Sequence, residues 1–159
     1  MVPLFAVPSP PDPVRVARSG DRIVVTLRGL LDSAVGAALD DRLRAAPWEE
    51  GDRLLIDLRE VTDFNEAGAA CLLRTHGALV AVRPCRSAYL TDRPRLRALI
   101  FKIIHGTQDK NTRPVASLTA ADAWLREASG QAFADVSLDR ARTLLGRLQE
   151  RLRDRRSTQ

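Results

Sequence analysis

The sequence predicts an α/β domain with a mixed sheet of about five strands and about four helices. One observation is that short apolar runs with strand spacing alternate with stripes of apolar residues three or four positions apart, which are typical of helices. Another is the run Arg53–Arg59, whose nearly continuous apolar character is typical of a central strand covered on both faces. The length of 159 residues suits one domain rather than two.

The first expected elements are a leader, a hairpin and a helix. Residues 1–13 hold five of the nine prolines, so we expect an extended leader. Val14–Arg18 and residues 22–28 follow as two strands joined by a tight turn. The apolar residues then change to helical spacing, which predicts a helix capped by Ser33 and closed by Pro47.

A strand, a short loop and a helix come next and form the first half of a βαβ unit. The strand is the apolar run Arg53–Arg59, and residues 60–64 are expected to connect it to the helix. A helical stripe of apolar residues covers residues 69–80, with Asn65 as the expected N-cap. We therefore expect the following strand to lie parallel to this one.

The rest of the domain is predicted as a strand, a helix, a strand and a helix. The expected ranges are Ser87–Thr91, 94–106, Pro114–Leu118 and 119–128. A polar loop, Gln108–Arg113, precedes the last strand. The segment Thr119–Asp122 resembles a capping box with Asp in place of Glu, and the helix that it starts should bury Trp124 or Leu125.

Residues 129–159 are expected to form an appendage, separate from a domain that covers residues 14–128. Leucines recur there at helical spacing among many arginines, which predicts an amphipathic C-terminal helix. Residues 137–159 contain seven Arg and three acidic residues, a net charge of +4. This helix could pack on the domain, pair in a homodimer, or contact an anionic membrane or nucleic acid. Nucleic acid is least favoured because no aromatic side chains separate these arginines.

The composition indicates a folded cytoplasmic protein. Apolar residues make up 45% and charged residues 28% of the chain, which excludes collagen-like and wholly disordered classes. Arginine supplies nearly all of the positive charge behind the net +5, a bias more typical of a GC-rich genome than of nucleic-acid binding. No run approaches the ~18 apolar residues of a membrane span, and residues 1–13 lack the pattern of a signal peptide.

The sequence contains no familiar motif for catalysis, a cofactor or a metal. It has no glycine-rich phosphate loop, no dinucleotide-binding glycine motif and no G-x-S-x-G elbow. Cys71 and Cys85 form no C-x-x-C pair and have no histidine cluster nearby, so both are expected to be reduced thiols. His76 and His105 are expected to pack or to cap helices. These observations favour a binding protein over an enzyme.

Two motifs resemble the STAS family, which contains bacterial anti-sigma factor antagonists. One is Gly29-Leu30-Leu31-Asp32 after the second strand, and the other is the segment Asp57–Gly68, DLREVTDFNEAG, before the second long helix. The family usually ends the second motif with D-S-S-G. The resemblance covers Val14 to Ala128 and implies a STAS-like fold, in which Asp32 and Asp57 are framework residues.

The second motif departs from the family where the family's chemistry lies. In members that work by partner switching, the serine before the glycine is phosphorylated by an ATP-dependent anti-sigma factor kinase, and the unphosphorylated antagonist binds that kinase. Ala67 stands at the position of this serine and has no hydroxyl, so it cannot be phosphorylated. Glu66 replaces the preceding serine and Asn65 the aspartate. Glu66 could imitate a phosphate, but we favour a simple interaction with the helix dipole.

The resemblance implies a partner-binding site without phosphorylation control. Its expected residues are Thr62, Asp63, Asn65, Glu66, Ala67 and Gly68. Gly68 has two interpretations: it leaves room for a partner's backbone, or tight internal packing excludes a Cβ there. The expected partner is a protein, either an anti-sigma factor kinase or a subunit of a larger complex. The alternative function is a STAS-like subunit or scaffold of a transporter ATPase or stress-signalling assembly, assembled through the C-terminal helix.

Overall fold

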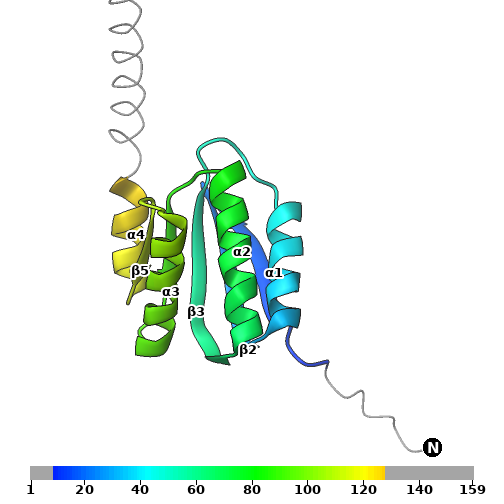
Figure 1. Cartoon of the computed structure of the whole chain (residues 1–159). Helices are drawn as coiled ribbons and strands as arrows, with labels where there is room; N and C mark the ends of the chain where they lie inside the picture. Colours follow the sequence, from blue (N-terminus) through cyan, green and yellow to red (C-terminus); the bar gives the residue numbers. More distant parts are fainter. Residues whose placement is uncertain (1–8, 128–159) are drawn as a thin grey trace, which may run out of the picture. The chain divides into compact units, whose positions relative to one another are not determined.

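The computed structural model describes residues 9–127, which form a five-stranded sheet and four helices (Figure 1). The strands are β1 (Val14–Ser19), β2 (Arg22–Leu31), β3 (Arg53–Phe64), β4 (Ser87–Leu90) and β5 (Thr112–Val115). The helices are α1 (Ser33–Ala45), α2 (Glu66–Val82), α3 (Pro94–Thr107) and α4 (Leu118–Arg126). The predicted α/β fold is confirmed, while the expected C-terminal helix lies outside the described residues.

The strands lie in the order β1-β2-β3-β4-β5. β1 runs antiparallel to β2, and the other neighbours are parallel. The β1–β2 connection is the predicted hairpin: Ser19 pairs with Arg22, so the turn has two residues, and Gly20 adopts a φ of 60°. Glycine suits this position because a side chain disfavours positive φ.

Helices pack on both faces of the sheet. α1, α2 and α3 lie side by side on one face (Figure 1), over a core that includes Leu54 and Ile56 of β3. α4 contributes Trp124 and Leu125 to a second core on the other face, where they pack with Leu55 of β3. β3 is thus buried on both sides, as its apolar run predicts. None of the described helices is long and apolar enough to cross a membrane.

The bounds of three strands were predicted wrongly. β2 continues to Leu31, so Gly29, Leu30 and Leu31 belong to this strand and do not follow it. Residues 60–64, expected as a loop, continue β3 and pair with the end of β2, where Val61 lies opposite Gly29 and Phe64 opposite Leu31. Two register shifts in this pairing interrupt the regular alternation and obscure the strand in the sequence. β5 begins at Thr112, inside the expected polar loop, and ends before Leu118. A proline inside β5 is tolerated because this strand lies at the edge of the sheet.

Two of the three predicted helix caps were also wrong. Asn65 caps α2 as expected, with its side chain accepting a hydrogen bond from Gly68 N. α1 is capped by Asp32 rather than Ser33, because Asp32 Oδ1 accepts from Val35 N at 2.9 Å. α4 is capped by Ser117, whose Oγ accepts from Ala120 N at 3.1 Å, so the helix begins at Leu118 and Thr119 lies within its first turn.

Candidate protein-docking site

The expected docking residues lie at the carboxyl-terminal end of the parallel strands, where β3 ends and α2 begins. Thr62 and Asp63 close β3, Asn65 is the N-cap of α2, and Glu66 and Ala67 form the first turn of that helix. All five residues are exposed. The parallel strands all end on this side of the sheet, and open α/β sheets commonly bind their ligands at the carboxyl ends of their strands. We name the segment Thr62–Ala67 the β3–α2 turn.

Gly68, the sixth expected residue, is buried beneath this turn. A Cβ on Gly68 would lie 2.0 Å from the carbonyl oxygen of Leu31 and 2.9 Å from Cα of Asp32. Those atoms belong to the backbone and cannot rotate away. The internal packing of α2 against the end of β2 therefore explains why this position has no side chain, which was one of the two interpretations of the sequence.

The β3–α2 turn is held in place by two hydrogen bonds of Asn65, one from its side chain and one from its backbone. Asn65 Oδ1 accepts a hydrogen bond from Gly68 N at 2.8 Å, and Asn65 N donates to the Leu31 carbonyl at 3.2 Å. Phe64, which precedes the cap, is half-buried against the main core. A turn held in this way is preorganised, so a partner that binds it loses little conformational entropy.

The outward side of the turn carries a methyl group and a carboxylate. Ala67 offers no atom that could accept a phosphoryl group. Glu66 lies in the first turn of α2, where a negative charge interacts favourably with the amino end of the helix. This surface can therefore bind a partner through van der Waals contact, charge and complementary shape.

Two arginines from the start of α3 complete the site, and sequence reasoning missed both. Arg93 Nη1 donates to the carbonyls of Val61 at 2.6 Å and Thr62 at 3.0 Å, so its guanidinium holds the end of β3. Arg95 Nη1 lies 3.0 Å from Asp63 Oδ1, and its guanidinium carbon lies 5.1 Å from the centroid of the Phe64 ring. The sequence signal for both was their position beside Pro94, the first residue of a predicted helix after a parallel strand.

These side chains line an open pocket of about 390 Å³ between the end of β3 and the start of α3. Thr62, Asp63 and Phe64 form one side, and residues 93–96 form the other. The exposed ion pair between Asp63 and Arg95 crosses from one side to the other. The pocket and the β3–α2 turn share residues 62–64, so a partner could bind both at once.

The histidines, the cysteines and Asp57 are not part of this site, whereas Asp32 caps α1 beside Gly68. His76 is buried, with Nδ1 2.9 Å from Tyr89 Oη and Nε2 3.0 Å from Asp109 Oδ2. Burial alone would raise the pKa of Asp109, but hydrogen bonds from His76 and Thr112 outweigh it and leave the pKa below its usual value. This network connects α2, β4 and β5 and serves the core.

The other candidate residues named from the sequence neither belong to the β3–α2 turn nor line its pocket. Burial raises the pKa of the Cys85 thiol, which makes it a poor nucleophile. Asp57 forms an ion pair with Arg59 at 2.7 Å, in keeping with a framework role. His105 is exposed in the last turn of α3. Within residues 9–127, no three metal-ligating side chains come together.

Comparisons with known proteins point to one family and one fold. Residues 14–86 match the family described as "Mlab, STAS domain". An anti-sigma factor antagonist from Mycobacterium paratuberculosis is 23% identical, with a TM-score of 0.52 over 71% of this chain and 92% of that chain. A variant of RsbS from Moorella thermoacetica is 16% identical, with a TM-score of 0.55 over 75% of this chain and 100% of that one.

A third solved structure with this fold comes from a transport protein. The sulfate transporter family protein from Wolinella succinogenes is 13% identical, with a TM-score of 0.52 over 69% of this chain and 92% of that chain. No curated protein matches the sequence. At these identities, the likeness to the three structures concerns the fold.

Proposed function

Because this chain is a STAS-domain protein, we propose that it is a non-catalytic regulator in the cytoplasm that binds a protein partner through the β3–α2 turn. The expected partner is an anti-sigma factor kinase. Binding is not controlled by phosphorylation at the family's serine position, because Ala67 occupies it.

The observation that carries this proposal is the contrast between the two sides of the turn. Its inner side is fixed by Gly68 against the Leu31 carbonyl and by the Asn65 cap. Its outer side, with Glu66 and Ala67, is exposed and open to a partner. The backbone that presents the family's functional position is thus firmly held, although the phosphorylated side chain is missing.

Site-specific crosslinking tests where the partner binds. A photoreactive phenylalanine analogue placed at Ala67 should crosslink the kinase, whereas the same residue at Ala123, an exposed position on the opposite side of the sheet, should not. Both positions are exposed alanines within helices, so the two variants are matched. Equal crosslinking at the two positions would contradict the proposed docking site.

The affinity of the kinase for charge variants gives a second measurement. Ala67→Glu adds a negative charge at the centre of the proposed interface and should weaken binding about tenfold or more, since truncations and charges at the centre of an interface have the largest effects. Ala123→Glu adds the same charge elsewhere and should leave the dissociation constant unchanged. Titration calorimetry on both purified proteins measures the difference.

The second candidate function is assembly into a larger complex through residues 129–159. The shared fold with a sulfate transporter family protein and the leucine spacing of the arginine-rich segment favour it. Leu145→Glu together with Leu148→Glu should then reduce the assembly's mass in light scattering, while Arg147→Glu serves as the control. An unchanged mass in the double variant would contradict assembly through this segment.

A further inference from the structure

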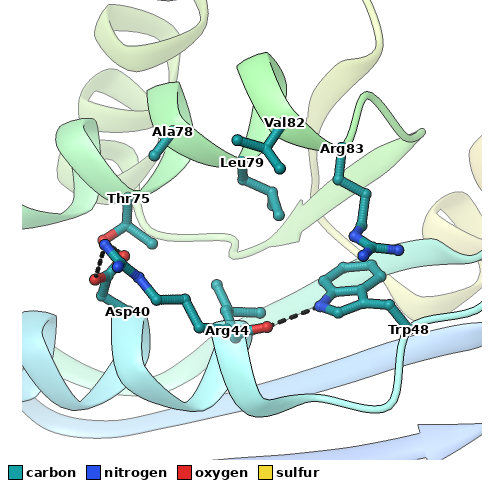
Figure 2. A pocket seen from close by; sticks show the side chains of 9 residues that line it. Asp40, Arg44, Trp48, Thr75, Ala78, Leu79, Val82 and Arg83 are labelled. Carbon is teal, nitrogen blue, oxygen red and sulfur yellow. Dashed lines mark hydrogen bonds and ion pairs between the residues drawn. The ribbon is translucent and has the colours of Figure 1, made fainter.

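A second pocket lies at the other end of α1 and α2, away from the β3–α2 turn. It has a volume of about 390 Å³ and is bordered by the last turns of both helices and by the segment that follows α1 (Figure 2). This volume falls in the range of sites for small ligands, about 300–1,000 Å³. None of the residues assigned to the docking site lines it.

The interior of the pocket is apolar and partly rigid. Leu43 of α1 is buried, Leu79 of α2 is half-buried, and both belong to the edge of the main core. The indole of Trp48 forms one wall and is fixed by a hydrogen bond from its Nε1 to the Leu43 carbonyl, at 2.7 Å. Val82 extends this apolar surface outward and is 82% exposed.

The charges around the pocket favour an anion. Asp40 is already neutralised by Arg44, whose Nη2 lies 2.8 Å from Asp40 Oδ2 (Figure 2). Arg83 stacks on Trp48, with its guanidinium carbon 5.1 Å from the ring centroid, and makes no ion pair with a carboxylate of residues 9–127. The charge of Arg83 helps to lower the pKa of Asp52, but the direct partner of that carboxylate is Arg18, which binds it with both terminal nitrogens and also pairs with Glu49.

Within residues 9–127, the Arg83 guanidinium thus acts on Asp52 only at longer range and forms no direct ion pair, and it lies at the rim of the pocket next to an apolar wall. A guanidinium binds a carboxylate through parallel hydrogen bonds while its own plane remains stacked on an aromatic ring. We propose that this pocket binds a small amphipathic carboxylate, with its apolar chain along Leu79, Val82 and Trp48 and its carboxylate on Arg83. The proposal is independent of the protein partner at the β3–α2 turn.

The two tryptophans of the chain provide a probe and an internal control within the wild-type protein. Trp48 lines the pocket. Trp124 belongs to α4 and is buried on the other face of the sheet, where its Nε1 donates to the Ser87 carbonyl. In a nitrogen–proton NMR titration with octanoate, the indole signal of Trp48 should shift in a saturable manner and that of Trp124 should not. Assignment of the two signals needs only one Trp→Phe variant.

Octan-1-ol separates recognition of the carboxylate from simple apolar binding. It has the same chain without the charge, so octanoate should bind about threefold more tightly at low salt, as expected for an exposed ion pair. Arg83→Gln should abolish this preference, while Arg74→Gln, an arginine of α2 outside the pocket, should keep it. Equal affinity for both probes in the wild type, parallel shifts of both tryptophans, or an unchanged preference in Arg83→Gln would each overturn the proposal.

Discussion

Replacing Gly68 by alanine should destabilise the fold strongly, although alanine is the better helix former. The added Cβ would lie 2.0 Å from the Leu31 carbonyl oxygen and 2.5 Å from its carbonyl carbon. Ordinary van der Waals contact begins at 3.4 Å, so α2 and the end of β2 must separate by more than one ångström. Overpacking of this kind costs typically 1–3 kcal/mol, and more where only backbone can move. We expect a loss of about 3 kcal/mol or more in the free energy of unfolding.

Gly77 provides the matched control on the same helix. A Cβ there meets its nearest neighbour, Cγ2 of Thr107, at 3.7 Å, which is an ordinary contact. Gly77→Ala should therefore stabilise the protein by about 0.5–1 kcal/mol, because glycine inside a helix loses more backbone entropy on folding than alanine does. The same substitution on one helix is thus expected to have opposite signs at two positions.

Urea unfolding followed by circular dichroism measures both free energies in the full chain. The reasoning would be refuted if Gly68→Ala changed the free energy of unfolding by less than about 1 kcal/mol, the lower end of the overpacking range, or if both substitutions shifted it in the same direction. The first outcome would reopen the alternative that Gly68 leaves room for a partner's backbone.

Three further predictions concern buried or capping hydrogen bonds and can be checked by the same unfolding experiment. Asn65→Ala removes the cap of α2 and should cost about 0.5–2 kcal/mol, while Asn65→Asp should retain most of the stability; equal losses would argue against a capping role. Trp124→Phe leaves the Ser87 carbonyl without its indole donor and should cost about 1–3 kcal/mol, and a neutral result would mean that this bond contributes nothing. The lowered pKa of Asp109 contributes stability that is present above the carboxyl's usual pKa and is lost as the pH falls through its folded value. The wild type should therefore lose more stability below about pH 4 than Asp109→Asn does, and identical acid profiles would contradict this.

The sequence predicted those parts of the fold that depend on periodicity and local capping. The hairpin, the double-sided burial of β3 and the Asn65 cap follow from residues that are close together in the chain. The continuation of β3 through residues 60–64 depends on pairing with the end of β2, about thirty residues away, with two register shifts. Tertiary pairing of this kind has no local pattern, so the segment was expected to be a loop.

The candidate site was predicted only in the part that the family motif covers. Five expected residues lie on one exposed turn, but Arg93 and Arg95 join them only because parallel strands bring successive loops to one edge. Gly68 could be interpreted in two ways from the sequence, and the position of the Leu31 carbonyl, which no local pattern encodes, favours one of them.

The central claim concerns a docking turn whose phosphorylation switch is absent, and restoring the hydroxyl tests it most directly. Ala67→Ser places a hydroxyl on the exposed first turn of α2, and the small, polar side chain should leave the fold intact. The complex of each protein with the anti-sigma factor kinase would be followed by size-exclusion chromatography after ATP is added. We predict that the wild-type complex persists and that the Ala67→Ser complex dissociates as the serine is phosphorylated, because the phosphate adds about −1.5 to −2 charges at the interface. Equal persistence of the two complexes, or a wild type that binds no such kinase, would contradict the account.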